Sequence, residues 1–143
     1  MPADDHLGLQ LRQPVERGQR AGHRADFAGY AATFTEDGEF KHSPALPAAH
    51  TRAGIIAVLE DFHQKFDARK IQRRHWFNHV AVDQAPDGSI TATSYCLVLT
   101  VHADVKEPEF GPSCVVHDVL VRGENDELLL RSRHVTHDHV FPG

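Results

Sequence analysis

The chain of 143 residues has little sulfur and few large aromatic side chains: two cysteines, one methionine, one tryptophan and two tyrosines. Cys96 and Cys114 cannot build a disulfide framework, and they fit a reducing compartment. No apolar run approaches the roughly 20 residues that span a bilayer. The first residues, Met1 to Asp5, lack the basic and apolar regions of a secretory leader. These absences predict a soluble cytoplasmic protein.

Positive charge is also scarce. The chain has 15 Lys and Arg against 20 Asp and Glu, a formal net charge of -5, and no basic run. This balance argues against a nucleic-acid surface and against a polybasic membrane patch. The length is typical of one domain that folds around its own core, so we expect a single domain over residues 1–143.

Histidine, in contrast, is abundant, with 12 in the chain. Its unperturbed pKa of about 6.5 allows it to take and release protons near neutral pH, and neutral imidazole is a common metal ligand. This excess therefore indicates proton chemistry or metal binding.

The hydrophobic pattern changes from helical to strand periodicity near residue 70. We predict helices over residues 4–20, 25–34 and 51–66, the last capped by Thr51, and a brief strand over 39–42 followed by a loop over 43–50. Four long strands follow, joined by hairpins, over residues 71–83, 89–102, 113–122 and 127–138. This order predicts an α+β domain with helices on one face of a curved antiparallel sheet. Both faces of 89–102 are partly apolar, so we expect a homodimer.

Four short motifs occur in order along the chain: residues 31–40 (AATFTEDGEF), 54–56 (GII), 75–78 (HWFN) and 133–138 (RHVTHD). The first resembles the L-F-x-E-D-G-x-F signature of the SnoaL-like branch of the nuclear-transport-factor-2-like superfamily. The ordered set resembles that branch over about residues 20–138. The resemblance implies a cone: a strongly curved antiparallel sheet wrapped around N-terminal helices and enclosing an apolar pocket.

Within this superfamily the histidines resemble the scytalone-dehydratase-like pattern. That pattern places one pocket histidine at the start of a strand and another seven residues after a tyrosine, and His75 and His102 (after Tyr95) fill these positions. His23 stands where the family has an acid, and His42 stands where it has a pocket tyrosine. The resemblance thus implies His75 and His102 as an acid–base pair, with His23 and His42 orienting the substrate.

Four more residues complete the predicted substrate-binding set: Asn78, His117, Phe34 and Val98. Of the neighbours His117 and Asp118, one should face inward, because successive strand residues point to opposite faces. The alternative to an inward His117 is a buried Asp118 that holds either a backbone group or the Arg133 side chain.

A histidine pair in an apolar pocket can enolise a carbonyl, eliminate water, open an epoxide or drive a ring closure, all without a cofactor. The leading hypothesis is therefore a cofactor-independent cyclase, dehydratase or isomerase acting on a hydrophobic, polyketide-like intermediate. We expect no metal in this site.

Three alternatives stay open. The first is a non-catalytic small-molecule-binding or accessory dimerisation domain, because fold alone does not define function. The second is an epoxide hydrolase with an Asp-Arg-Asp set, of which Asp118 and Arg133 supply two members. The third is a metal enzyme that uses His134, His137 and His139, although a frayed polar terminus explains these residues more simply. We interpret Lys41, Arg73 and Arg74 as solvated charges and the two cysteines as small buried residues.

Overall fold

The computed structural model describes residues 26–67 and 70–140. The expected helix over residues 4–20 and the candidate His23 lie outside the described residues. The described elements, in chain order, are α2 (Phe27–Ala31), β1 (Phe34–Lys41), β2 (Ala49–His50), α3 (Thr51–Asp67), β3 (Ile71–Gln84), β4 (Ile90–His102), β5 (Glu109–Arg122) and β6 (Leu128–His137).

The strands form one sheet in the order β2-β1-β6-β5-β4-β3. The expected α+β fold is confirmed. The four long strands lie close to their expected positions, although β5 begins at Glu109, four residues earlier than predicted. The four long strands pair antiparallel as expected, but the sheet as a whole is mixed, because β1 runs parallel to β6. These two strands are joined through α3 and four further strands, and a connection of that length permits parallel pairing.

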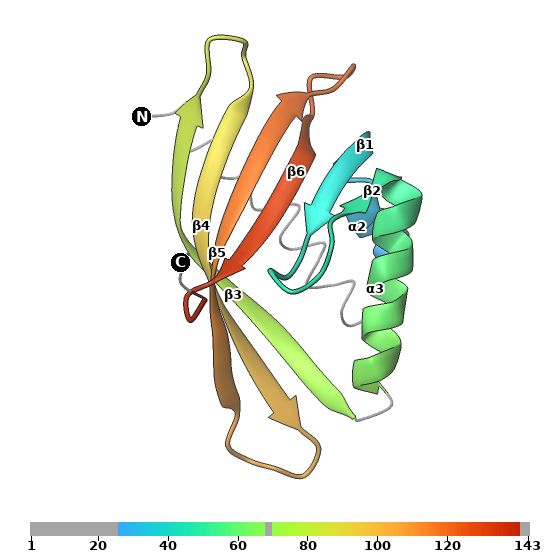
Figure 1. Ribbon diagram of the computed structural model, residues 1–143, viewed down its shortest axis with the longest axis vertical. Coiled ribbons are helices and arrows are strands. Elements are labelled where there is room, and N and C mark those ends of the chain that lie inside the picture. Colours follow the sequence, from blue (N-terminus) through green and yellow to red (C-terminus); the bar gives the residue numbers. More distant parts are fainter. Residues whose placement is uncertain (1–25, 68–69, 141–143) are drawn as a thin grey trace.

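The sheet curls around α3 (Figure 1). The helix contacts β1 and β2 at one edge of the sheet and β3 at the opposite edge. The Arg52 guanidinium holds the start of the helix to β1 by donating two hydrogen bonds, of 2.9 and 2.6 Å, to the Phe34 carbonyl. The described sheet is therefore an open cone with α3 on its concave side.

The second predicted helix is shorter than expected, and β1 is longer. Asp26 caps α2 by accepting a hydrogen bond from the Gly29 amide at 2.9 Å. The Thr33 hydroxyl donates to the Tyr30 carbonyl at 2.6 Å, and the Thr33 carbonyl accepts from the Leu130 amide on β6 at 2.8 Å. Pairing with β6 thus ends the helix and starts β1, a long-range effect that local periodicity does not contain.

The start of α3 agrees with the prediction. Thr51 has a φ of 65°, and its hydroxyl accepts a hydrogen bond from the Gly54 amide at 3.2 Å, as an N-cap side chain does. The short strand β2, which directly precedes it, lies within the segment expected to be a loop.

The core has two parts. One contains the rings of Tyr30, Phe34 and Phe40, whose centroids are 5.6 to 5.8 Å apart in edge-to-face contact, packed with Ile55 of α3. The other lies on the sheet itself and consists of Cys96, Val98, Cys114 and Val116, with Phe77 and Val135 packed against it. The second part lines the middle of the concave face.

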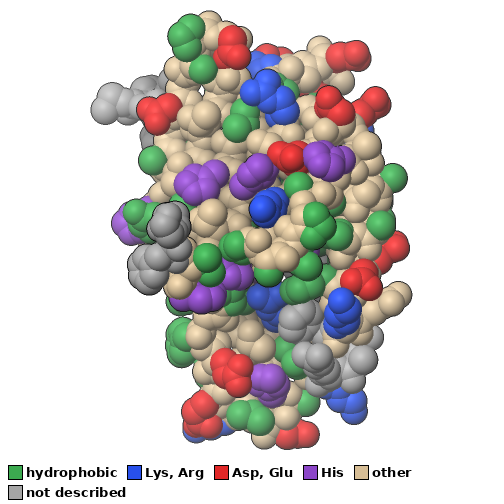
Figure 2. Space-filling view, in the orientation of Figure 1, with side chains coloured by type: hydrophobic (Ala, Val, Ile, Leu, Met, Phe, Trp, Pro, Cys, Tyr) green, Lys and Arg blue, Asp and Glu red, His purple; other side chains and the backbone are tan. Residues whose placement is uncertain are grey.

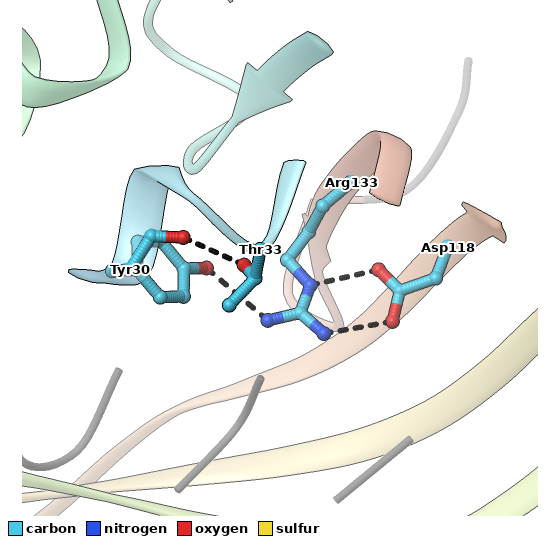
Figure 3. Close-up of polar contacts among 4 residues, drawn as sticks. All are labelled: Tyr30, Thr33, Asp118 and Arg133. Atoms are coloured by element: carbon cyan, nitrogen blue, oxygen red, sulfur yellow. Dashed lines mark hydrogen bonds and ion pairs between the residues drawn. The ribbon is translucent and has the colours of Figure 1, made fainter. Parts of the chain in front are cut away.

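A buried ion pair joins the two parts of the core (Figure 3). Arg133 of β6 lies opposite Asp118 of β5, and its Nε and Nη2 atoms each donate to the carboxylate at 2.8 Å. Arg133 Nη1 also donates to the Tyr30 hydroxyl oxygen at 3.1 Å, which ties α2 to the sheet. Burial opposes the charge of Arg133, but Tyr30 and Asp118 outweigh it and raise the pKa of the guanidinium above its usual range.

The pair predicts a large loss of stability when one partner is neutralised. Asp118→Asn leaves the Arg133 charge buried without its counter-ion, so the free energy of unfolding should fall by about 3–5 kcal/mol. Urea denaturation at pH 7 measures the change. Asp126→Asn is the matched control, because Asp126 forms an exposed ion pair with Arg122, and this variant should lose less than about 1 kcal/mol. Equal losses in the two variants would contradict the assigned role.

The convex face of the sheet carries exposed apolar side chains on β3 to β5. Trp76 is 62% exposed and Phe110 is 72% exposed, and Tyr95 and Leu97 of β4 lie beside the β3 residues. Among the described residues no helix is long and apolar enough to cross a membrane.

We expect this convex patch to be covered by a second copy of the chain, as the apolar pattern of both strand faces predicts. Light scattering after size-exclusion chromatography should give twice the mass of the chain, and Trp76→Lys should shift the equilibrium towards the monomer. Glu127→Lys, at an exposed position in the β5–β6 turn, is the control and should leave the mass unchanged. A monomeric wild-type protein at micromolar concentration would refute the expectation.

Candidate active site

The concave side of β3 carries the candidate His75 together with two neighbours on the same face, Arg73 and Phe77. Arg73, His75 and Phe77 are partly buried, whereas their neighbours Gln72, Arg74, Trp76 and Asn78 are exposed. This alternation follows the two-residue repeat of a strand. His75 lies opposite Val98 and Phe77 lies opposite Cys96, so both are next to the apolar middle of the concave face.

His75 is held neutral. Burial, followed by the positive charges of Arg73 and Arg133, lowers the pKa of His75 to about 4. At neutral pH its imidazole therefore carries no charge and has one ring nitrogen that can accept a proton.

Arg73 occupies the space between the sheet and α3. Its Cζ atom lies 5.3 Å from the centroid of the Phe62 ring, in a cation–π contact. Burial lowers the pKa of Arg73. The interpretation of Arg73 as a solvated charge is wrong, because its side chain shares the concave face of His75. The two-residue spacing from His75 was the signal that could have identified it.

His42, which follows β1, lies against two aromatic rings. Its centroid is 5.6 Å from that of Phe40 in a stacked arrangement and 5.2 Å from that of Phe62 at a steep angle. Burial, followed by the charge of Arg73, lowers the pKa of His42. The structure thus places His42 beside the same aromatic ring that Arg73 contacts.

His137 at the end of β6 is a further histidine on this side that sequence reasoning did not place in the site. It lies opposite Cys114, and burial, then His139 and then Arg73, lower its pKa. The neighbouring thiols stay protonated at neutral pH, since burial raises the pKa of Cys96 to about 12 and also raises the pKa of Cys114. Arg73 is thus an electrostatic neighbour of three imidazoles from three segments.

His102 is not brought next to His75. It lies opposite Ile71, whereas His75 lies opposite Val98, so the two histidines are four residues apart along β3, roughly 13 Å. His102 Nε2 is 3.3 Å from a carboxylate oxygen of Glu109. His102 also lines a hollow of about 540 Å³ between the start of β3 and residues 101–106.

Two predicted substrate contacts lie on the convex face. His117 is exposed, because Asp118 takes the inward position; the alternative interpretation, in which Asp118 holds Arg133, is confirmed. Asn78 is exposed opposite Tyr95, and its Oδ1 atom accepts a hydrogen bond from the His79 amide at 2.8 Å. Neither side chain can reach the concave face from these positions.

The two predicted apolar contacts are buried. Val98 lies in the middle of the concave face beside His75. Phe34 has no exposed surface and packs within the aromatic part of the core.

The described residues do not assemble a metal or epoxide-hydrolase site. No group of three His, Cys, Asp or Glu side chains in residues 26–67 and 70–140 is arranged to hold a metal ion. His134 points away from His137, and its Nε2 atom lies 2.6 Å from a carboxylate oxygen of Glu39 on the neighbouring strand β1. Histidine side chains form a band across the face that Figure 2 shows. Asp118 is the only buried carboxylate in the described part of the chain, and Arg133 occupies both of its oxygens.

The arrangement therefore offers neutral imidazoles and a guanidinium on an apolar surface. A neutral imidazole can remove a proton from carbon, and a nearby cation can stabilise the oxyanion that forms. Both effects are stronger where water is excluded.

Comparisons with known proteins give a consistent result. A family model described as "SnoaL-like domain" matches residues 8–134. ActVI-ORFA from Streptomyces coelicolor is 74% identical, with a TM-score of 0.87 over 96% of this chain and 99% of that one. A Catenulispora acidiphila protein, solved in complex with S-DNPA, is 40% identical, with a TM-score of 0.82 over 94% of this chain and 96% of that one.

A third solved structure is Aln2 from a Streptomyces species, which is 30% identical, with a TM-score of 0.80 over 94% of this chain and 92% of that one. A search of curated proteins finds no match.

The buried His75 predicts a specific loss of stability in acid. Above pH 6.5 its imidazole is neutral in the folded and the unfolded chain. As the pH falls from 6.5 to about 4, the unfolded chain gains a proton that the folded chain does not, because the folded pKa is about 4. Between pH 7 and pH 4.5 the wild type should therefore lose about 2 kcal/mol more stability than His75→Asn.

Urea denaturation at the two pH values measures this difference. His79→Asn, at an exposed position of the same strand, should lose as much as the wild type. If His75→Asn shows the full acid-induced loss, His75 is not held neutral by the fold.

Proposed function

This chain belongs to the SnoaL-like domain family, and on that premise we propose that it is a cofactor-independent enzyme of the cyclase or dehydratase type. Its substrate is a hydrophobic, polyketide-like intermediate that carries a carbonyl group. The reaction transfers protons without net oxidation or reduction, so it needs no redox cofactor. Its place is the cytoplasm, where both thiols stay reduced.

The observation that carries this proposal is the environment of His75. The imidazole is partly buried on the concave face and its pKa is about 4, so it is neutral at physiological pH. Two guanidinium groups, of Arg73 and Arg133, act on it electrostatically. Arg133 is bound to Asp118, and the Arg73 guanidinium lies against the Phe62 ring of α3.

We assign the proton-abstracting role to His75. Its unprotonated ring nitrogen takes a proton from the carbon next to the substrate carbonyl, and the electron pair of that C–H bond forms an enolate. The developing charge on oxygen is stabilised by the positive potential of Arg73. From the enolate, loss of a β-hydroxyl as water gives dehydration, and attack on a second carbon centre gives ring closure.

His42 is the candidate for the second proton-transfer group. Like His75, it is partly buried and lies within the electrostatic reach of Arg73. We therefore transfer to His42 the role that the sequence resemblance gave to His102. His102 lines the hollow beside the strand ends, about four residues along β3 from His75.

The relative from Catenulispora acidiphila supports the small-molecule part of the proposal. Its structure was solved in complex with S-DNPA, and its fold matches this chain over nearly the full length. We propose that this chain binds a small hydrophobic molecule on its concave face.

The enolisation step can be tested without the natural substrate. The protein is incubated in D₂O with 1-tetralone and 2-tetralone, bicyclic aromatic ketones, and proton NMR follows the exchange of the hydrogens next to the carbonyl. His75→Asn should reduce the enzyme-dependent exchange rate by about 10²- to 10⁴-fold, the usual contribution of a general base. His42→Asn should reduce it less, because another group or water can return the proton.

His79→Asn is the matched control on the same strand and should exchange like the wild type. Equal rates in the wild type and in His75→Asn would remove His75 as the base. If the protein binds the ketones but gives no exchange above buffer, the non-catalytic binding domain becomes the better interpretation.

A further inference from the structure

The two cysteines of the chain lie directly opposite each other on neighbouring strands. Cys96 of β4 pairs with Cys114 of β5 in the antiparallel register of the sheet. Both are free thiols, and both are buried in the middle of the concave face, with exposed fractions of 4% and 3%. The proposed proton transfer uses neither thiol, although they occupy the face that also carries His75.

The backbone around the two cysteines already has the spacing of a disulfide. Directly opposite residues of an antiparallel pair have Cα atoms about 4.5 or 5.5 Å apart, and disulfides join residues whose Cα atoms are about 4.4–6.8 Å apart. The register of β4 with β5 is regular up to Leu97, so the cysteines lie before the irregularity between Leu97 and Leu99. A bond between the sulfurs therefore needs side-chain rotation and a small approach of the Cβ atoms, but no change of register.

The contacts of the two thiols agree with this placement. Burial raises the pKa of Cys96 to about 12, and Cys114 is the next contributor, so the two sulfurs lie within electrostatic reach of each other. The Cys114 thiol donates a hydrogen bond to the Pro112 carbonyl, with 3.7 Å between sulfur and oxygen. Because S–H is a weak donor, a disulfide would give up little hydrogen bonding at Cys114.

Burial also determines which oxidants can reach the two sulfurs. The reactive form of a cysteine is the thiolate. Burial raises the pKa of both thiols, and the positive charge of Arg73 lowers each pKa without outweighing burial. Thiolate is therefore scarce at neutral pH, and the sulfurs are covered. We expect slow oxidation, and an oxidant of about the size of water should be preferred to a bulky disulfide such as oxidised glutathione.

We propose that Cys96 and Cys114 are a redox pair, which hydrogen peroxide converts reversibly into an intramolecular disulfide. In the first step one thiolate sulfur attacks a peroxide oxygen, the O–O bond breaks, and the leaving hydroxide takes up the thiol proton to form water. The second sulfur then attacks the sulfenic acid, and its proton leaves with the hydroxyl group as a second water. Two electrons pass from the sulfurs to the peroxide, and dithiothreitol returns them by thiol–disulfide exchange.

The disulfide joins β4 to β5 at the centre of the concave face, between Phe77 on β3 and His137 on β6. It also constrains the unfolded chain, so the oxidised protein should resist urea better than the reduced protein. In a reducing compartment the pair stays reduced, and the disulfides that do form there are usually transient and redox-sensing or catalytic. The redox pair is independent of the proposed function, because no step of the oxidation uses His75.

Intact-mass spectrometry of the folded, full-length protein tests the proposal. The reduced protein is treated with a small molar excess of hydrogen peroxide, the peroxide is removed with catalase, and the remaining thiols are alkylated with iodoacetamide in urea. The wild type should lose two hydrogen atoms and take up no alkyl group, and dithiothreitol should restore two thiols that alkylate. Proteolytic digestion should give one disulfide-linked peptide pair with Cys96 and Cys114, and oxidation should raise the urea midpoint.

Cys96→Ala and Cys114→Ala are the matched variants. Each keeps one thiol, which has no partner within the chain, so peroxide should add oxygen to it or leave it free to alkylate. Neither variant should lose two hydrogen atoms, and peroxide should not raise the urea midpoint of either. If a variant does not fold, the wild type decides through the linked peptide pair and its reversal by dithiothreitol.

Two thiols that still alkylate after peroxide treatment of the wild type would overturn the proposal. A disulfide between chains, visible as a doubled mass on a non-reducing denaturing gel, would also overturn it, as would oxygen adducts in place of the disulfide. An oxidised protein whose urea midpoint is unchanged or lower would show that the sheet opposes the bond, which contradicts the spacing inferred from the register.

Discussion

The ion pair between Arg133 and Asp118 connects the fold of this protein to its chemistry. It joins β5 to β6 across the middle of the sheet, and through the Tyr30 hydroxyl it also holds α2. A buried ion pair contributes little net stability because both charges lose their water. Its effect is instead specific: only one register of β5 and β6 brings the guanidinium opposite the carboxylate on the concave side.

The same pair sets the electrostatics of the interior. Both carboxylate oxygens of Asp118 accept hydrogen bonds from Arg133. The Arg133 guanidinium nevertheless contributes to lowering the pKa of His75. Together with Arg73 it makes a positive environment in which histidines remain neutral. The number of histidines in the sequence is therefore less informative than their burial and the place of two arginines, because burial first and the arginine charges second lower the pKa values of the imidazoles on the concave face.

Much of the fold follows from the sequence. The long strands have clear two-residue alternation, and α3 has a helical apolar stripe and a threonine cap, so local patterns were sufficient. The end of α2 and the parallel pairing of β1 with β6 were not predictable in this way, since both depend on β6, which lies about 90 residues further along the chain.

The site was predicted in part. His75, Val98 and His42 lie on or beside the concave face, and alternation from His75 would also have found Arg73. His102 was assigned from a resemblance in spacing, and that spacing does not account for the four-residue offset along β3. His117 faces outward because Asp118 takes the inward position, a choice that depends on a partner in another strand.

Within residues 26–67 and 70–140, β3 is the last strand of the sheet and pairs with β4 alone. Its register with β4 shifts between Asn78 and Ala81, so the segment with Arg73 and His75 is separated by this irregularity from the rest of the strand. An edge strand gives up few hydrogen bonds when it moves. Sequence changes near the shift can therefore slide or tilt the segment with Arg73 and His75 while β4, β5 and β6 keep their pairing. Such a scaffold can acquire new substrate preferences in evolution without a new fold.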